Sequence, residues 1–431
     1  MKRTRTLIPF FLWITLFCFH AIPLSAQEKR SDEKTLLFFI AKDTVEHEIM
    51  GYFYRTQSHD FHDPVAPRFI MASRNQNFIL GLGGYVLLRM YDDFGGICDN
   101  GDYSTMAIPV PNAGNPRSQF KMDAGSSRIF MKVIGNTDAL GQLVGYIEGD
   151  FGGSSYAFRL RQAYIHFLGF TLGQTLSTFI DPRAVAPSLD QNGAIASYNL
   201  RTPMVRFTHT FKSCITFAAA AELPVYSGTY SGQTESASAT VPDLPCYIQY
   251  GKDPLHLRLS AVFRNLSYKD LENGKYRTVF GAGGKISTNI KIAAPVSLYG
   301  FAAYGKGIST YMQDFAKMGL DILPDADHSG KMMALKSASY YGALKLNYSK
   351  KLYSTFAYNY CRLYPDASYR NSSLFDPSAF YKHGQAISAS MIWEFIPEAF
   401  CGLEYWRGRH TVYNGDYGKA NRIYAVIRYN F

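Results

Sequence analysis

Long hydrophobic runs are almost absent from this chain of 431 residues. The apolar stretch from Leu7 to Phe19 is too short to span a bilayer comfortably, and no later segment reaches the length of a membrane helix. The mean hydropathy is near neutral, at −0.13. These properties exclude a protein that crosses a membrane with helices.

The amino-terminal residues have the features of a secretory signal peptide. Lys2, Arg3 and Arg5 form a positive region, the stretch 7–19 is apolar, and 24–26 offers small residues for cleavage. We therefore expect residues 1–26 to be removed, with an uncleaved anchor helix as the alternative.

Cysteine chemistry is poorly supported in the exported chain. Five cysteines follow residue 26, an odd number, and no CxxC pair is present. This spacing argues against a disulfide framework and against a zinc site. The hydrolase motif G-x-S-x-G is also missing. The sequence predicts no catalytic residue, metal site or cofactor.

The net charge is positive. The whole chain carries +10, and removing the three cations of the signal peptide leaves +7. A basic excess suits nucleic acid, anionic lipid or anionic solutes. Export argues against nucleic acid as a partner, so lipid and solute remain.

Aromatic residues and glycine are abundant. The chain contains 32 Tyr, 31 Phe and 36 Gly. Outer-membrane β-barrels combine alternating apolar and polar residues with aromatic girdles at the membrane interfaces. This composition therefore favours an all-β transmembrane barrel.

The period of the sequence changes to two at Phe78. Residues 27–77 predict a periplasmic extension, and 78–431 predict an antiparallel up-and-down barrel of about sixteen strands. An even number of strands is the rule for bacterial barrels. The expected strands are 78–91, 126–136, 141–150, 156–167, 169–178, 200–211, 213–222, 245–250, 255–264, 276–287, 294–304, 337–348, 351–361, 384–394, 397–408 and 421–431.

The connections alternate in length. Most odd-numbered joins are long, as at 179–199, 223–244, 305–336 and 362–383, whereas the joins between them are short. Outer-membrane barrels have short periplasmic turns and long outer loops. The pattern places the amino terminus in the periplasm and the protein in the bacterial outer membrane.

The two faces of the last strand supply a rule for orientation. Ile423, Ile427 and Phe431 share one face, and Arg422 and Arg428 share the other. An arginine facing lipid near the bilayer midplane costs about 2–4 kcal/mol. The arginine face is therefore predicted to line the lumen, and Phe431 is predicted to face lipid and to act as an assembly signal.

The same rule collects more cations on the inner face. Arg159 and Arg161 oppose Leu160 and Tyr164, so Tyr164 and His166 are expected to face lipid. Guanidinium groups in a lumen attract anions and hold carboxylates by paired hydrogen bonds. Alternatively, each arginine pairs with an acid such as Glu148 or Asp150 and braces the wall. The predicted pore-lining residues are Arg128, Lys132, Arg159, Arg161, Arg206, Arg258, Arg264, Lys285, Arg422 and Arg428.

The third outer loop, 179–199, is the expected constriction. In trimeric porins this loop folds inward and narrows the pore. Here it would carry Asp181, Arg183 and Asp190 toward the predicted arginine wall. An ordinary surface loop is the alternative, since loop position alone implies little.

The stretch from Gly125 to Phe211 resembles the DcaP-like family of trimeric outer-membrane porins. The resemblance rests on 125–128, 148–151, 159–164, 173–175 with Phe179 and Asp181, and 188–190. It implies a sixteen-stranded trimer, an inward third loop and uptake of small negatively charged molecules such as dicarboxylates. It also implies that Arg128, Arg159 and Arg161 lie on the pore side. Family members often carry an amino-terminal coiled coil, but residues 27–77 have no sustained heptads.

The leading hypothesis is an outer-membrane porin for small anionic, dicarboxylate-like solutes. Expected partners are outer-membrane lipid and lipopolysaccharide, two further copies of the chain, and the barrel-assembly machinery through Phe431. One alternative is an outer-membrane enzyme such as a phospholipase, using His166 on the outer wall. Another is a structural or adhesive barrel plugged by residues 27–77. The sequence leaves both open.

Overall fold

The computed structural model describes residues 61–65, 67, 69–73, 77–111 and 118–431. The predicted signal peptide, 1–26, lies outside the described residues, as does most of the predicted extension 27–77. Within the described part of the chain, no helix is long and apolar enough to span a membrane.

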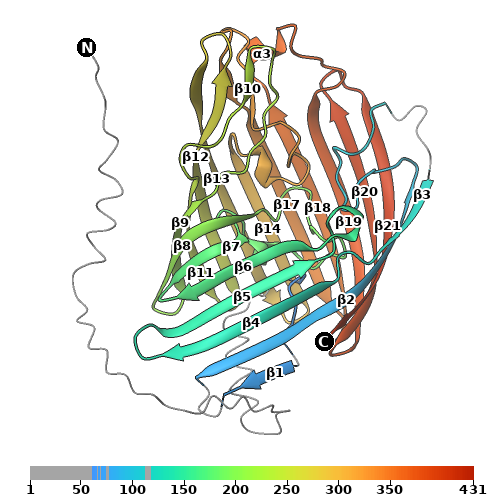
Figure 1. Ribbon diagram of the computed structural model, residues 1–431. Helices are drawn as coiled ribbons and strands as arrows, with labels where there is room; N and C mark the ends of the chain where they lie inside the picture. The colour runs from blue at the N-terminus through green and yellow to red at the C-terminus, as the bar shows by residue number, and fades with distance from the viewer. Residues whose placement is uncertain (1–60, 66, 68, 74–76, 112–117) are drawn as a thin grey trace, which may run out of the picture. The chain divides into compact units, whose positions relative to one another are not determined.

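The described residues form a closed antiparallel barrel (Figure 1). Its sheet has 19 strands, and leaving out the short strands β1, β3 and β10 gives a wall of 16. The predicted fold class is thus confirmed. The wall strands are β2 (Phe78–Phe94), β4 (Arg128–Thr137), β5 (Gly141–Asp150), β6 (Arg159–Phe167), β7 (Phe170–Leu176), β8 (Arg201–Phe211), β9 (Ile215–Glu222), β11 (Leu244–Lys252), β12 (Leu255–Asp270), β13 (Lys275–Ala293), β14 (Val296–Lys306), β17 (Lys336–Asn347), β18 (Leu352–Tyr364), β19 (Tyr381–Ile396), β20 (Ala399–Val412) and β21 (Tyr417–Asn430).

The barrel closes where β2 pairs with β21, with Tyr85 opposite Asn430 and Phe94 opposite Asn421. Closure leaves no strand edge in the membrane, where unpaired backbone groups would be costly. Shorter elements lie outside the sixteen wall strands, several of them in the loops. They are β1 (Phe69–Ala72), β3 (Ser118–Asp123), β10 (Thr234–Ser236), β15 (Ile322–Pro324), β16 (Met332–Ala334), η1 (Ser154–Tyr156), η2 (Pro182–Ala184), η3 (Ser309–Tyr311) and α3 (Ala367–Arg370).

Two outer connections are shorter than the sequence suggested. The expected strands ended at 264 and 408, but β12 continues to Asp270 and β20 to Val412. The hairpin of β12 and β13 is held at its tip by Arg277, whose Nε donates to Asp270 at 2.9 Å. Cross-strand pairs of this kind stabilise a ladder beyond the hydrophobic band that the periodicity marks.

The predicted orientation of Tyr164 and His166 is wrong. The register between β5 and β6 shifts after Glu148, so Gln162 pairs with Glu148 while Leu160 pairs with Gly149. The extra residue at this β-bulge reverses the alternation along the strand. Tyr164 therefore packs on Tyr146 inside the barrel, and His166 Nδ1 lies 3.0 Å from the hydroxyl of Thr171.

The wall has a low side and a high side. Strands β4 to β9 have 7 to 11 residues each, whereas β12 and β13 have 16 and 19. About 9–11 tilted residues are enough to cross the hydrocarbon core. The low side therefore barely spans the membrane, and the high side stands above it on the loop end.

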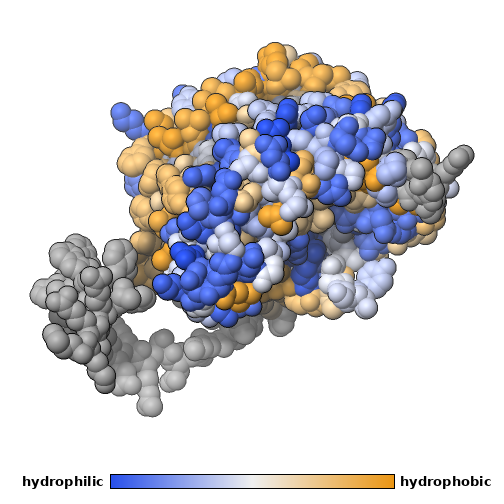
Figure 2. All heavy atoms as spheres, turned by 90° about the horizontal axis from the view of Figure 1, so that it is seen from above, coloured by the Kyte–Doolittle hydropathy of each residue, from blue (hydrophilic) through white to orange (hydrophobic). Residues whose placement is uncertain are grey.

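Three long outer loops pack inside the barrel. We name them by their order: the first loop (95–117, described to 111), the third loop (177–200) and the sixth loop (307–335). Each contributes buried apolar residues to one cluster with inward wall residues, including Tyr103, Phe179 and Tyr311. Seen from above, hydrophilic residues gather over this end and hydrophobic ones lie along much of the rim (Figure 2).

The closing seam yields a prediction about stability. Gly84 and Phe431 exchange two backbone hydrogen bonds of 3.0 Å, and a Cβ on Gly84 would lie 2.2 Å from the carbonyl oxygen of Arg128. We expect Gly84→Ala to lower the free energy of unfolding by about 1–3 kcal/mol, because overpacking forces the backbone apart. Gly342→Ala is the matched control, since nothing lies within 4 Å of its added Cβ. Heat-modifiable migration in gels measures the folded fraction, and equal loss in both variants would contradict the prediction.

Candidate permeation pathway

The third loop crosses the interior and is fixed to opposite parts of the wall. At its start, the Asp181 carboxylate lies 2.8 Å from His256 Nε2 on β12 and accepts a hydrogen bond of 2.5 Å from Ser287 on β13. Further on, Glu404 of β20 accepts three hydrogen bonds from the loop. Their donors are the Ser188 hydroxyl and the backbone N–H groups of Leu189 and Asp190, at 2.9, 2.6 and 3.0 Å. Hydrogen bonds to a buried carboxylate are about twice as strong as neutral ones.

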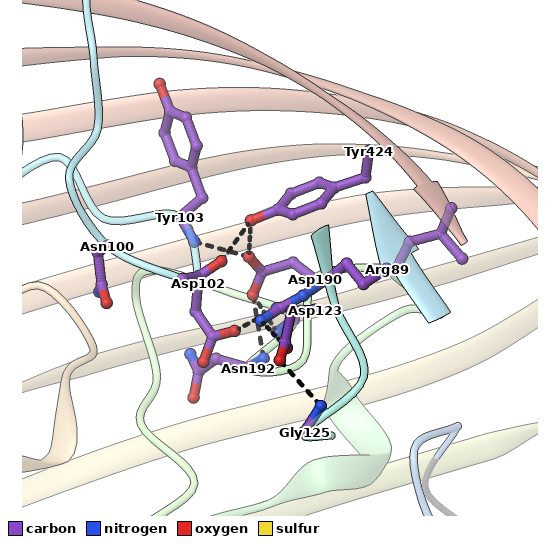
Figure 3. Close-up of polar contacts among 12 residues, drawn as sticks. Arg89, Asn100, Asp102, Tyr103, Asp123, Gly125, Asp190, Asn192 and Tyr424 are labelled. Atoms are coloured by element: carbon purple, nitrogen blue, oxygen red, sulfur yellow. Dashed lines mark hydrogen bonds and ion pairs between the residues drawn. The ribbon is translucent and has the colours of Figure 1, made fainter. Parts of the chain in front are cut away.

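Asp190 is the junction between the third loop, the first loop and the wall (Figure 3). Its carboxylate accepts hydrogen bonds from Tyr103 N–H at 2.7 Å and from the Tyr424 hydroxyl at 2.8 Å. It also accepts bonds from the backbone N–H groups of Asn192 and Gly193. Burial raises the pKa of Asp190, so this carboxyl group takes up a proton at a higher pH than an exposed aspartate does.

Two arginines hold the first loop against the wall. Arg89 on β2 donates to Asp102 at 2.7 Å and to Asp123 at 3.1 Å (Figure 3). Arg422 on β21 makes a two-pronged ion pair with Asp93 at 2.5 and 2.9 Å, and it donates to the Cys98 carbonyl oxygen. Arg422 is fully buried, so its role is structural: it attaches the first loop to the wall.

The sixth loop completes the packing. The buried Asp314 carboxylate accepts hydrogen bonds from Ser104, Thr105 and Tyr381, which joins the sixth loop to the first loop and to β19. Arg264 on β12 pairs with Asp243 at 3.0 Å and donates to the Gly307 carbonyl oxygen at 2.8 Å.

Most of the predicted pore-lining cations have protein partners. Arg159 binds Asp150 with two bonds of 2.9 and 2.8 Å, and Arg161 bridges Glu148 and Asp150 at 3.1 and 2.6 Å. Arg128 donates to Glu148 at 3.3 Å. These contacts are the wall network of paired arginines and acids that the sequence also allows. Arg159 still leaves about half of its side chain exposed, at 52%.

The remaining predicted pore-lining cations contact other groups of the protein. Arg258 donates to Gln249 and to the Ile180 carbonyl oxygen, and Arg206 donates to the Leu176 carbonyl oxygen. Lys285 is buried 4.0 Å from the ring centroid of Phe301, and Lys132 is buried in the wall. Arg428 donates to the backbone carbonyl groups of Phe61 and Asp63.

Two cavities lie on opposite sides of the third loop. The outer cavity, of about 1140 Å³, is lined by Arg159, Arg161 and Arg201 together with Asn192 of the loop. The periplasmic cavity, of about 730 Å³, is lined by Arg183 of the same loop. Different parts of the third loop line the two cavities, 182–187 the periplasmic one and 191–200 the outer one, so the loop lies between them.

Sequence reasoning did not identify Arg89 and Arg201. Arg201 opens β8 at the end of the third loop, and its buried Nε has no hydrogen-bond partner among the described residues. Pro203 interrupts the alternation here, so no face was assigned. Arg89 follows apolar residues in β2 at inward parity, and the arginine rule applied to that strand would have found it.

Comparison with known proteins agrees with the barrel, and it defines the class of the protein as an outer-membrane channel of the porin type. The family model of the DcaP outer membrane protein matches residues 72–431, and the chain belongs to that family. A comparison with curated protein sequences finds no match.

Solved structures share the fold. The outer-membrane channel DcaP of Acinetobacter baumannii is 20% identical with a TM-score of 0.71, over 84% of this chain and 99% of that one. The anion-selective porin from Comamonas acidovorans is 10% identical with a TM-score of 0.54, over 82% and 100%. OmpT of Vibrio cholerae in its trimer form is 12% identical with a TM-score of 0.50, over 82% and 99%.

The anchoring of the third loop predicts a change in conduction. Glu404→Leu keeps the approximate shape but removes every acceptor, and each lost bond to a charged group costs about 1.5–3 kcal/mol. We expect the loop to leave its position and the single-channel conductance to rise, with frequent current fluctuations. Glu235→Leu removes an exposed carboxylate that pairs only at the surface with Lys269 and serves as the control. Unchanged conductance in Glu404→Leu would contradict the anchoring role.

Proposed function

We propose that this protein is a homotrimeric porin through which small solutes diffuse, with a preference for anionic, dicarboxylate-like molecules. The observation that carries the proposal is the charge of the two cavities beside the third loop. The outer cavity is lined by six cations and four acids, namely Arg89, Lys121, Arg159, Arg161, Arg201 and Lys317 against Asp99, Asp102, Asp123 and Asp314. The periplasmic cavity adds Arg183, Lys252, Lys291 and Lys345 against Asp63, Asp253 and Glu394.

The balance of charge supports anions rather than cations. Rings of arginine and lysine favour the passage of anions through pores. A cation whose donor groups are not all bonded to the protein can also donate hydrogen bonds to a passing anion. Arg201 has such capacity, because among the described residues its guanidinium donates from Nη1 to the Asn199 carbonyl oxygen at 3.1 Å and its buried Nε has no partner. The structural relative from Comamonas acidovorans is described as anion-selective, which agrees with the proposal.

The low side of the wall supports the trimer. Strands β4 to β8 expose large apolar residues, including Ile129, Ile147, Leu160 and Val205. These short strands give little height for lipid contact, and apolar side chains on a short wall suit burial against other copies of the chain. The structural relative OmpT of Vibrio cholerae is described in a trimer form, which agrees with this assembly.

Other predicted features belong to the same proposal. In this proposal the signal peptide 1–26 directs export, and the predicted extension 27–77 belongs to the periplasmic side. Lipid and lipopolysaccharide surround the high side of the barrel. Phe431 lies at the seam with its side chain exposed on the outer surface, which suits recognition by the barrel-assembly machinery.

A closed structural barrel is the second candidate, because the first, third and sixth loops fill much of the interior with buried side chains. The enzyme hypothesis needs His166 on the outer wall. Because His166 lies inside the barrel, with Nδ1 3.0 Å from the Thr171 hydroxyl, it does not support that hypothesis. Purified protein in a planar bilayer separates the two candidates, since a closed barrel would give no stepwise current.

Reversal potentials under a potassium chloride gradient test the selectivity. We expect anion preference, and we expect Arg201→Gln to reduce the chloride-to-potassium permeability ratio roughly twofold, because a unit charge a few ångström away in water contributes about 1 kcal/mol before salt screening. Lys331→Gln removes one exposed charge from the sixth loop outside the cavities and should leave the ratio unchanged. Cation preference in the unmodified protein would overturn the proposal.

A further inference from the structure

The periplasmic cavity has an apolar half that a simple ion path does not need. Below the third loop it is lined by Pro182, Val185 and Pro187 of that loop, and by Phe61 and Pro64 of the segment before the barrel. Rigid proline rings and aromatic side chains present apolar surface without losing much conformational entropy. A hydrated chloride ion gains nothing from such a surface.

The segment before the barrel is firmly held where it forms this wall. Arg428 donates from Nη1 to the Phe61 carbonyl oxygen at 3.1 Å and from Nη2 to the Asp63 carbonyl oxygen at 2.9 Å. Tyr85 donates its hydroxyl to the His62 carbonyl oxygen at 3.3 Å. The Phe61 ring lies 5.3 Å from the ring of Phe400 on β20. These contacts hold Phe61 at a defined position in the barrel interior.

Cations lie at the same cavity. Lys345 Nζ lies 3.9 Å from the ring centroid of Tyr353, and Arg183 is exposed on the lower side of the third loop. Among the described residues, no carboxylate forms an ion pair with Lys345 or Arg183. Lys291, by contrast, is paired with Asp253 at 2.6 Å. Arg183, Lys345 and Lys252 at the end of β11 are thus the charges available to a bound anion, and of these Arg183 belongs to the third loop itself.

We propose that this cavity is a binding site for organic carboxylates that carry an apolar body. The inference rests on the proposed function, because a solute reaches the cavity by passing the third loop or entering from the periplasm. The carboxylate binds Arg183 and Lys345, and the apolar body lies against Phe61 and the prolines of the third loop. A volume of about 730 Å³ suits an organic ligand, since such sites commonly enclose about 300–1000 Å³.

With this site, the two sides of the third loop differ in the contacts that they offer to a solute. The outer cavity offers polar contacts beside Arg201 and Asn192, whereas the periplasmic cavity adds apolar contacts to its cations. Anions of equal charge are therefore distinguished on the periplasmic side by their carbon skeletons.

Block of the chloride current by benzoate and by acetate tests this site in the full-length protein. Both probes carry one carboxylate, but only benzoate has a large apolar body. Added to either side of a planar bilayer, benzoate should halve the current at a concentration at least fivefold below that of acetate. Arg183→Gln with Lys345→Gln should raise the half-blocking concentration of benzoate at least threefold. Phe61→Ser should raise it for benzoate and leave it unchanged for acetate.

Lys275→Gln, at an exposed position on the outer hairpin, is the control and should alter neither value. Equal block by the two anions, or benzoate block that survives both sets of substitutions, would overturn the site even if the pore prefers anions. If the pore instead prefers cations while benzoate blocks as expected, the proposed function fails and the site stands. Folding of each variant is checked by heat-modifiable migration.

Discussion

The carboxylate of Glu404 holds the arrangement on which the rest of the interior depends. It receives the Ser188 hydroxyl and two consecutive backbone N–H groups, and so fixes the far end of the third loop to β20. Asp181 fixes the near end to β12 and β13. With both ends anchored, the loop divides the lumen into an outer and a periplasmic cavity.

Buried charge has two separate roles in this barrel. Arg422 with Asp93, and Arg264 with Asp243, are enclosed pairs that fasten loops to the wall. Breaking one partner of such a pair is costly because it leaves an unpaired buried charge. Arg201, Arg183 and Lys345 lie at the cavities with fewer protein partners, so they are the groups that can act on a solute. The arginines that prompted the hypothesis of an anion channel are therefore mostly structural, and the proposed selectivity depends on a smaller set.

The sequence predicted the barrel well because its signals are local. Alternation along single strands places Ile129, Val205 and Ile427 on the outer surface, where the structure also has them. The face of Tyr164 was missed because a bulge depends on the partner strand, which no single strand reveals. The inward third loop was predicted, but the packing of the first and sixth loops around Asp314 was not. Those contacts join Asp314 to Ser104, which lies 210 positions before it, and to Tyr381, which lies 67 positions after it. No local sequence pattern encodes contacts between residues so far apart.

Anomalous scattering from a crystal soaked separately in bromide and in rubidium tests the central claim most directly. We expect bromide in the outer cavity beside Arg201 and in the periplasmic cavity beside Arg183 and Lys345, with rubidium absent from both positions. Rubidium at those positions, or bromide confined to the outer surface of the barrel, would contradict an anion path past the third loop.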